Sequence, residues 1–121
     1  MVALKKDEVE LIRNKSIKLF STPNILVNDV HKMLEEYKKF YTNASILNFL
    51  HDEELVNTAL SFFDNNLNIS LTSKKTFMHR NTLVYRIEKI KKILGLDIRI
   101  FSEAVVVGNL VVFYRNFIKI D

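Results

Sequence analysis

The chain has 121 residues, of which 48% are hydrophobic, and it carries a net charge of +4 and no cysteine. This length suits a single domain with a packed core, and the lack of cysteine excludes a disulfide framework, a thiol nucleophile and the common cysteine-based zinc sites. Two glycines and one proline are too few for the turns of an all-β protein, so an all-α fold is predicted.

The chain shows no signal for export or membrane insertion. Segment 1–15 interleaves charged and apolar residues and lacks the unbroken apolar stretch of a signal peptide. The longest apolar runs, such as Ala104 to Val107 and Leu110 to Tyr114, fall far short of the roughly 20 residues that a membrane-spanning helix requires. We therefore expect a soluble, cytoplasmic protein without a membrane partner.

The first 50 residues predict helices but carry no recognisable chemistry. Apolar residues recur at helical spacing over residues 4–20 and again over about 28–41. Residues 46–50 are expected to form a short apolar turn. We expect an N-terminal helical arm of unknown role over residues 1–50 and a second unit over 51–121.

The second unit is predicted to begin with a well-capped helix. Asp52 is a suitable N-cap, and apolar residues follow it at helical spacing. Asn65, Asn66 and Asn68 are expected to end this helix, because asparagine accepts left-handed and turn conformations more readily than most residues.

The next two helices are predicted to form a helix-turn-helix. A short helix covers about 69–76, residues 77–79 form a tight turn, and an amphipathic helix covers 80–94. Gly95 stands where a left-handed C-cap is required. A last helix over 102–117 is apolar around about half of its circumference, so it is either buried between several helices or has one side against a second subunit.

Charge is distributed unevenly along the chain. Residues 42–73 contain four acidic groups and no lysine or arginine, a net charge of −4, whereas residues 74–99 contain eight basic groups against Glu88 and Asp97, a net charge of +6. Such a concentration of positive charge is typical of a surface that binds a polyanion. A solvated helix face without a partner is the alternative.

The residue types around the turn suit contact with DNA. Amide and guanidinium groups form bidentate hydrogen bonds with base edges in the major groove. The predicted base-facing residues are Arg80, Asn81, Thr82 and Tyr85. The predicted phosphate-facing residues, whose contacts carry no sequence information, are Ser70, Thr72, Lys74, Lys75, Arg86, Lys89 and Lys92.

No pattern in the sequence indicates catalysis or metal binding. His31, His51 and His79 lack the spacing of paired metal ligands. The sequence also has no serine, histidine and carboxylate arrangement and no glycine-rich phosphate loop. We therefore predict neither an enzyme nor a cofactor, and we expect His79 to cap the following helix or to fix the angle of the turn.

Four short motifs follow one another between residues 65 and 97. They are Asn-Asn-x-Asn-Ile, His-Arg-Asn-Thr-Leu, Tyr-Arg followed by a hydrophobic residue, and Gly-Leu-Asp. In this chain the four motifs are Asn65, Asn66, Asn68 and Ile69; His79 to Leu83; Tyr85 to Ile87; and Gly95 to Asp97. In this order and spacing they resemble the C-terminal helix-turn-helix of PucR/CdaR-type bacterial regulators, the regulators of purine catabolism and sugar diacids. The resemblance covers about residues 52–118.

The resemblance implies a transcription regulator with a helical fold related to the DNA-binding domain of the factor for inversion stimulation. Family members usually carry a much longer regulatory region in place of residues 1–50, so we expect either a minimal version or a piece of a longer regulator. Ser73 and Thr76 depart from the family pattern, which usually has alanine and leucine there. A buried hydroxyl at either position requires a hydrogen-bond partner.

The sequence thus predicts a DNA-binding transcription regulator whose helix over 80–94 enters the major groove of double-stranded DNA. The excess apolar surface of the last helix predicts a homodimer that pairs through residues 102–118. The two copies would read half-sites separated by about 34 Å. The alternative is a helical protein–protein interaction module that has kept the fold and lost specific DNA binding.

Overall fold

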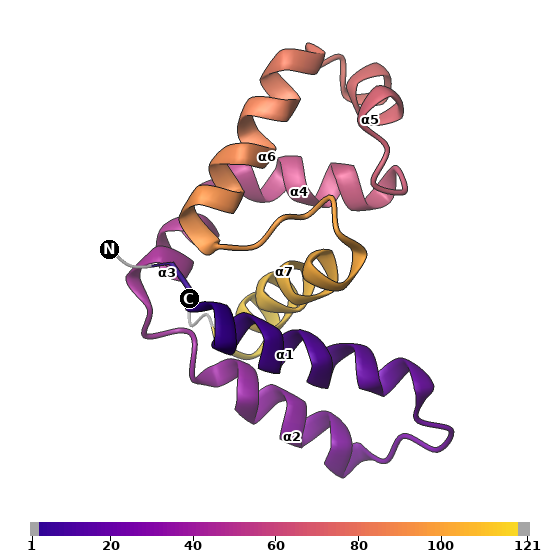
Figure 1. Cartoon of the computed structure of the whole chain (residues 1–121), viewed down its shortest axis with the longest axis vertical. Coiled ribbons are helices and arrows are strands. Elements are labelled where there is room, and N and C mark those ends of the chain that lie inside the picture. The colour runs from indigo at the N-terminus through magenta and orange to yellow at the C-terminus, as the bar shows by residue number, and fades with distance from the viewer. Residues whose placement is uncertain (1–2, 119–121) are drawn as a thin grey trace.

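The computed structural model describes residues 3–118, which form seven α-helices and no β-strand (Figure 1). The helices are α1 (Lys6–Lys18), α2 (Val27–Lys38), α3 (Ala44–His51), α4 (Glu53–Asp64), α5 (Ile69–Thr76), α6 (Arg80–Leu94) and α7 (Phe101–Phe113). A 3₁₀ turn (Leu19–Ser21) follows α1, and a π-helical turn (Tyr114–Ile118) follows α7. The predicted all-α class is confirmed.

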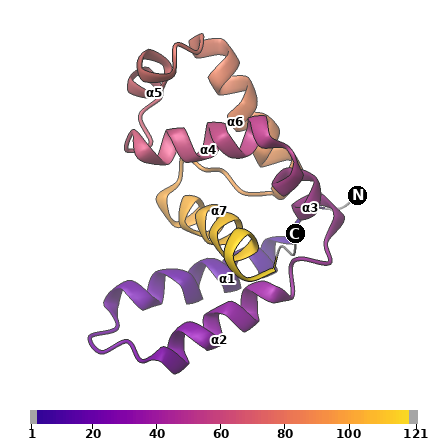
Figure 2. The same cartoon turned by 180° about the vertical axis from the view of Figure 1, so that it is seen from behind.

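The helices are arranged in three tiers along the long axis of the molecule (Figures 1 and 2). α1 and α2 form an antiparallel pair at one end, α7 lies in the middle, and α4, α5 and α6 form the other end. α7 contacts α1, α2 and α4, while α3 contacts α4 and α6. The N-terminal pair is therefore joined to the helix-turn-helix end mainly through α7.

A single hydrophobic cluster runs through these tiers and includes residues on both sides of position 50. Its fully buried large side chains come from α2, α3, α4, α6, the segment after α6, and α7: Tyr37, Ile46, Phe49, Val56, Phe62, Leu83, Ile87, Ile90, Leu94, Leu96, Ile98 and Leu110. The division of the chain into units over 1–50 and 51–121 stays a prediction.

Two buried tyrosines tie α2 and its C-terminal end to α7. The hydroxyl of Tyr37 shares a 2.7 Å hydrogen bond with that of Ser16 in α1 and accepts a 3.1 Å hydrogen bond from Asn109 in α7. Burial raises the pKa of Tyr37, so the side chain stays neutral. The hydroxyl of Tyr41 donates to the carbonyl of Leu110 over 2.8 Å. These polar contacts fix how the N-terminal pair sits on α7, because an unpaired buried hydroxyl is costly.

The predicted helix boundaries are mostly confirmed, with one error. Asp52 caps α4, its side chain accepting from the amide of Leu55 over 3.1 Å, and Gly95 ends α6 with a φ of 76°. Residues 46–50 are not a turn, because they lie within α3. That helix is capped by the Asn43 side chain and buries two apolar side chains, Ile46 and Phe49.

α7 has one buried side and one open side. Its buried residues are Ala104, Val106, Val107, Leu110 and Val111, and its exposed apolar residues are Phe101 and Val112. The stretch Phe101–Ile118 is long and apolar enough to cross a membrane by length and composition alone, a property shared by core helices. Here the helix packs between α1, α2 and α4. The predicted burial of this helix between several others is therefore correct for one of its sides, while the other side stays open.

Candidate DNA-binding surface

The turn between α5 and α6 is held by Ser73. The backbone carbonyl of Ser73 accepts hydrogen bonds from the amides of Phe77 and Met78, and its hydroxyl donates to the carbonyl of Met78 over 2.5 Å. Phe77 adopts the left-handed conformation with a φ of 56°. The serine that departs from the family pattern therefore has the partner that a buried hydroxyl requires.

The threonine hydroxyls of α5 bond to the helix itself. Thr76 donates to the carbonyl of Thr72 over 2.7 Å, and Thr72 donates to the carbonyl of Asn68 over the same distance. Thr72 is fully buried, so it has neither an exposed surface nor a spare proton for a phosphate. The predicted phosphate contact of Thr72 is therefore wrong. The eight residues of α5 are too few for their spacing to reveal which side is buried.

α6 turns an apolar side inward and a polar side outward. His79 caps the helix, its Nδ1 atom accepting from the amide of Asn81 over 3.1 Å. The inward side consists of Leu83, Ile87, Ile90 and Leu94, all fully buried. Asn81 and Tyr85 are exposed and Thr82 is half-buried, so these three predicted base-facing residues have side chains that are at least partly accessible.

The two arginines of α6 point in different directions. The Nη1 atom of Arg80 donates to the hydroxyl of Ser70 over 2.9 Å, which joins the beginnings of α6 and α5. Arg86 instead pairs with Glu54 of α4 and donates to the hydroxyl of Thr58 over 3.4 Å. The Arg86 side chain is only 23% exposed, so a phosphate contact would require this ion pair to open and stays a prediction.

The basic residues of segment 74–99 fall into two groups. Arg86, Lys91 and Arg99 form ion pairs with acidic residues of the same chain. Within the described range, the basic residues of this segment without an acidic partner are Lys74, Lys75, Arg80, Lys89 and Lys92. All five are exposed and lie on α5 and α6. The uncompensated positive charge of the segment is thus carried by these two helices.

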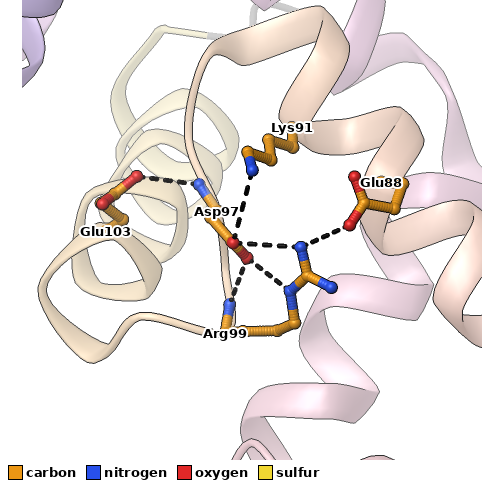
Figure 3. Close-up of polar contacts among 5 residues, drawn as sticks. All are labelled: Glu88, Lys91, Asp97, Arg99 and Glu103. Atoms are coloured by element: carbon orange, nitrogen blue, oxygen red, sulfur yellow. Dashed lines mark hydrogen bonds and ion pairs between the residues drawn. The ribbon is translucent and has the colours of Figure 1, made fainter.

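A network around Asp97 fastens the linker after α6 (Figure 3). The Asp97 carboxylate accepts from the backbone amide of Arg99 over 3.0 Å and from its Nε over 2.8 Å. The Nη2 atom of Arg99 also donates to Glu88 of α6 over 2.5 Å, while Glu103 of α7 accepts from the Asp97 amide over 2.9 Å. The sequence did not predict this network, although the Gly-Leu-Asp motif includes one of its members, Asp97.

The charges of this network reinforce one another. Burial raises the pKa of Asp97, but the hydrogen bonds from Arg99 outweigh that effect and hold the pKa below its ordinary value. The same hydrogen bonds, with those to Glu88, raise the pKa of Arg99. Asp97 and Arg99 therefore both stay charged at neutral pH, and the network sets the position of α6 relative to the beginning of α7.

Helix α3 borders the basic face of α6. A cleft of about 650 Å³ lies between them, lined by Tyr85, Lys89 and Lys92 on one side and by Ser45 and Asn48 on the other. The sequence did not predict this neighbourhood, because α3 and α6 are separated by two further helices along the chain. The N-terminal region thus reaches the surface that carries the uncompensated lysines.

Comparison with known proteins agrees with this geometry. Residues 55–108 match the family of PucR C-terminal helix-turn-helix domains. The chain is 37% identical over 70 residues to the YxkF protein of Bacillus subtilis, 33% over 70 residues to the purine catabolism regulatory protein of the same organism, and 41% over 46 residues to the carbohydrate diacid regulator of Escherichia coli. These alignments cover 58%, 54% and 38% of this chain. No solved structure matches the chain.

The alignments span only a small part of each relative, namely 24%, 13% and 12% of their lengths. The matched family segment begins within α4, contains all of α5 and α6, and ends within α7. It therefore includes the turn held by Ser73 and the exposed side of α6. Residues 55–108 of this chain are thus similar to PucR C-terminal helix-turn-helix domains.

Proposed function

We propose that this chain binds double-stranded DNA as the helix-turn-helix part of a bacterial, cytoplasmic transcription regulator and has no enzymatic activity. The observation that carries the proposal is the set of five exposed cations on α5 and α6 without an acidic partner in the described range. Phosphate groups neutralise such charges, and the release of counterions drives the binding.

In this proposal α6 lies in the major groove. Asn81, Thr82 and Tyr85 face the bases from its exposed side, with Asn81 suited to a bidentate contact with adenine. Arg80 also faces the bases once its guanidinium group releases the hydroxyl of Ser70. The freed Ser70 hydroxyl then contacts a phosphate. The lysines proposed to contact phosphates are Lys74, Lys75, Lys89 and Lys92. Arg86 instead positions α6 against α4 through its ion pair with Glu54.

We further propose that two copies pair through residues 102–118. The open side of α7 borders an apolar groove of about 600 Å³, lined by Phe63, Leu67, Phe101, Val105 and Val112 among others. Exposed apolar surface of this kind is typical of subunit interfaces. A monomer in sedimentation equilibrium at high micromolar concentration would contradict the pairing while leaving DNA binding by a single copy open.

Salt dependence tests the DNA-binding proposal. At about 0.9 per phosphate contact, the four lysines give a slope of about −3.6 per chain when the logarithm of the association constant is plotted against the logarithm of the salt concentration. The measurement is fluorescence anisotropy with a random-sequence duplex. Replacing Lys89 and Lys92 by glutamine is expected to reduce the slope by about 2. The matched control replaces Lys18 and Lys32, which are exposed on the N-terminal pair.

The control variant is expected to keep the wild-type slope, because its lysines lie away from α5 and α6. Absence of duplex binding at low salt would contradict the proposal and favour the alternative, a protein–protein interaction module that has kept the fold. Equal slopes for the two double variants would contradict the assignment of the phosphate contacts to α6.

A further inference from the structure

Phe77 combines two features that are unfavourable in the isolated chain. Its side chain is 95% exposed, the highest value among the exposed large hydrophobic residues of the described range. Its φ of 56° lies in the left-handed region, which disfavours a residue with a β-carbon. Glycine would occupy this position without either penalty.

The fold does not use the ring of Phe77. The turn is fixed through backbone groups and the Ser73 hydroxyl. Met78, the next residue, packs against the hydrophobic core, whereas Phe77 is not part of it. A bulky residue that is held in a strained backbone conformation and contributes nothing to packing points to a functional contact.

The surroundings of Phe77 indicate what the ring contacts. It follows Lys74 and Lys75, two of the uncompensated cations, and it precedes the first turn of α6 with Arg80 and Asn81. An apolar ring among cations suits a partner that is anionic and also presents apolar surface. A DNA duplex has both, since its phosphates alternate with deoxyribose and thymine places a methyl group in the major groove.

We infer that Phe77 contacts DNA, its ring packing against a deoxyribose or a thymine methyl group beside the helix-turn-helix. This inference rests on the proposed DNA binding and adds an apolar contact to the ionic and hydrogen-bonding ones. Such a contact contributes affinity by removing the ring from water, without any change in the number of phosphates neutralised.

The test is Phe77→Gly, measured by anisotropy with a duplex and by thermal unfolding. The affinity is expected to fall about tenfold, as for the loss of part of a buried aromatic side chain. The salt slope should not change, because no charge is removed, and the melting temperature should stay equal or rise. Phe77→Asn should behave alike, since asparagine tolerates the left-handed region. Val27→Asn, at an exposed position in α2, should leave the affinity unchanged.

Equal affinities of Phe77→Gly and the wild type would overturn the inference and leave the proposed function standing, whereas no duplex binding by the wild type would overturn both. A melting temperature that falls in both Phe77 variants would also overturn it, because the ring would then serve the fold. A duplex with deoxyuridine in place of thymidine shows whether the ring contacts the thymine methyl group or the deoxyribose. If the wild type loses affinity for this duplex and Phe77→Gly does not, the ring contacts the methyl group. If neither protein loses affinity, the ring contacts the sugar.

Discussion

Removing the charge of Asp97 should lower the free energy of unfolding by an amount that depends on how far its ion pair with Arg99 is buried. Asp97→Asn keeps the shape of the side chain but replaces a carboxylate that accepts from the amide, Nε and Nη2 of Arg99 over 2.8–3.1 Å. The Asp97 side chain is 13% exposed and that of Arg99 32%. Exposed ion pairs contribute about 0–1 kcal/mol, and breaking fully buried ones costs about 3–5 kcal/mol. We expect a loss of about 2 kcal/mol for this intermediate pair.

Thermal unfolding at neutral pH measures this loss. For a domain of this size about 1 kcal/mol corresponds to roughly 4 °C in the melting temperature, so Asp97→Asn should unfold about 8 °C lower than the wild type. The control is Asp64→Asn, an exposed aspartate at the end of α4, which should change the stability by less than about 0.5 kcal/mol. Equal melting temperatures of the two variants would show that the Asp97 carboxylate does not stabilise the fold.

The pH dependence provides an independent check on Asp97. Its pKa in the folded chain is below the unfolded value, so its contribution is fully present above the unfolded pKa and is lost as the pH falls through the folded pKa. The difference in melting temperature between wild type and Asp97→Asn should therefore be constant at neutral pH and shrink below about pH 4. A difference that stays constant into strong acid would show that the charge of Asp97 is not its cause.

Three further variants test other parts of the structure. Ser73→Ala removes the hydroxyl donor of the turn and should lower the free energy of unfolding in urea by about 1 kcal/mol; no loss would mean that the backbone alone holds the turn. Ile12→Ala, at a position 2% exposed, should cost about 2–4 kcal/mol in a single transition, whereas a separate early transition would show that the N-terminal pair unfolds independently. Asn48→Asp places a negative charge in the cleft beside α6 and should weaken duplex binding at low salt, with the effect fading as salt screens it; unchanged binding would exclude α3 from the interface.

Helices with clear periodicity and clear end signals could be predicted from the sequence. α6 shows apolar residues at helical spacing between His79 and Gly95, and the structure begins and ends the helix between those two residues. α3 could not be recognised in the same way, because eight residues give too short a pattern. Its stability comes from contacts with α4 and α6, which lie beyond the reach of local spacing.

The candidate site was predicted less completely than the fold, because the direction of a side chain depends on tertiary contacts. Arg86 belongs to a conspicuously basic segment, yet Glu54 of α4 holds it away from the outer face. Thr72 is a polar residue in a basic helix, yet the packing of α5 buries it completely. The sequence shows how many cations the segment has, but only the structure shows which of them lack an acidic partner.

The claim that α6 reads DNA bases can be tested by selecting bound sequences from a random duplex pool with the wild type and with Asn81→Ala. The wild type should enrich a defined sequence. Asn81→Ala should keep most of its affinity for bulk DNA but lose discrimination of about 1–3 kcal/mol at one base position. Enrichment of the same sequence with the same strength by both proteins would contradict the claim.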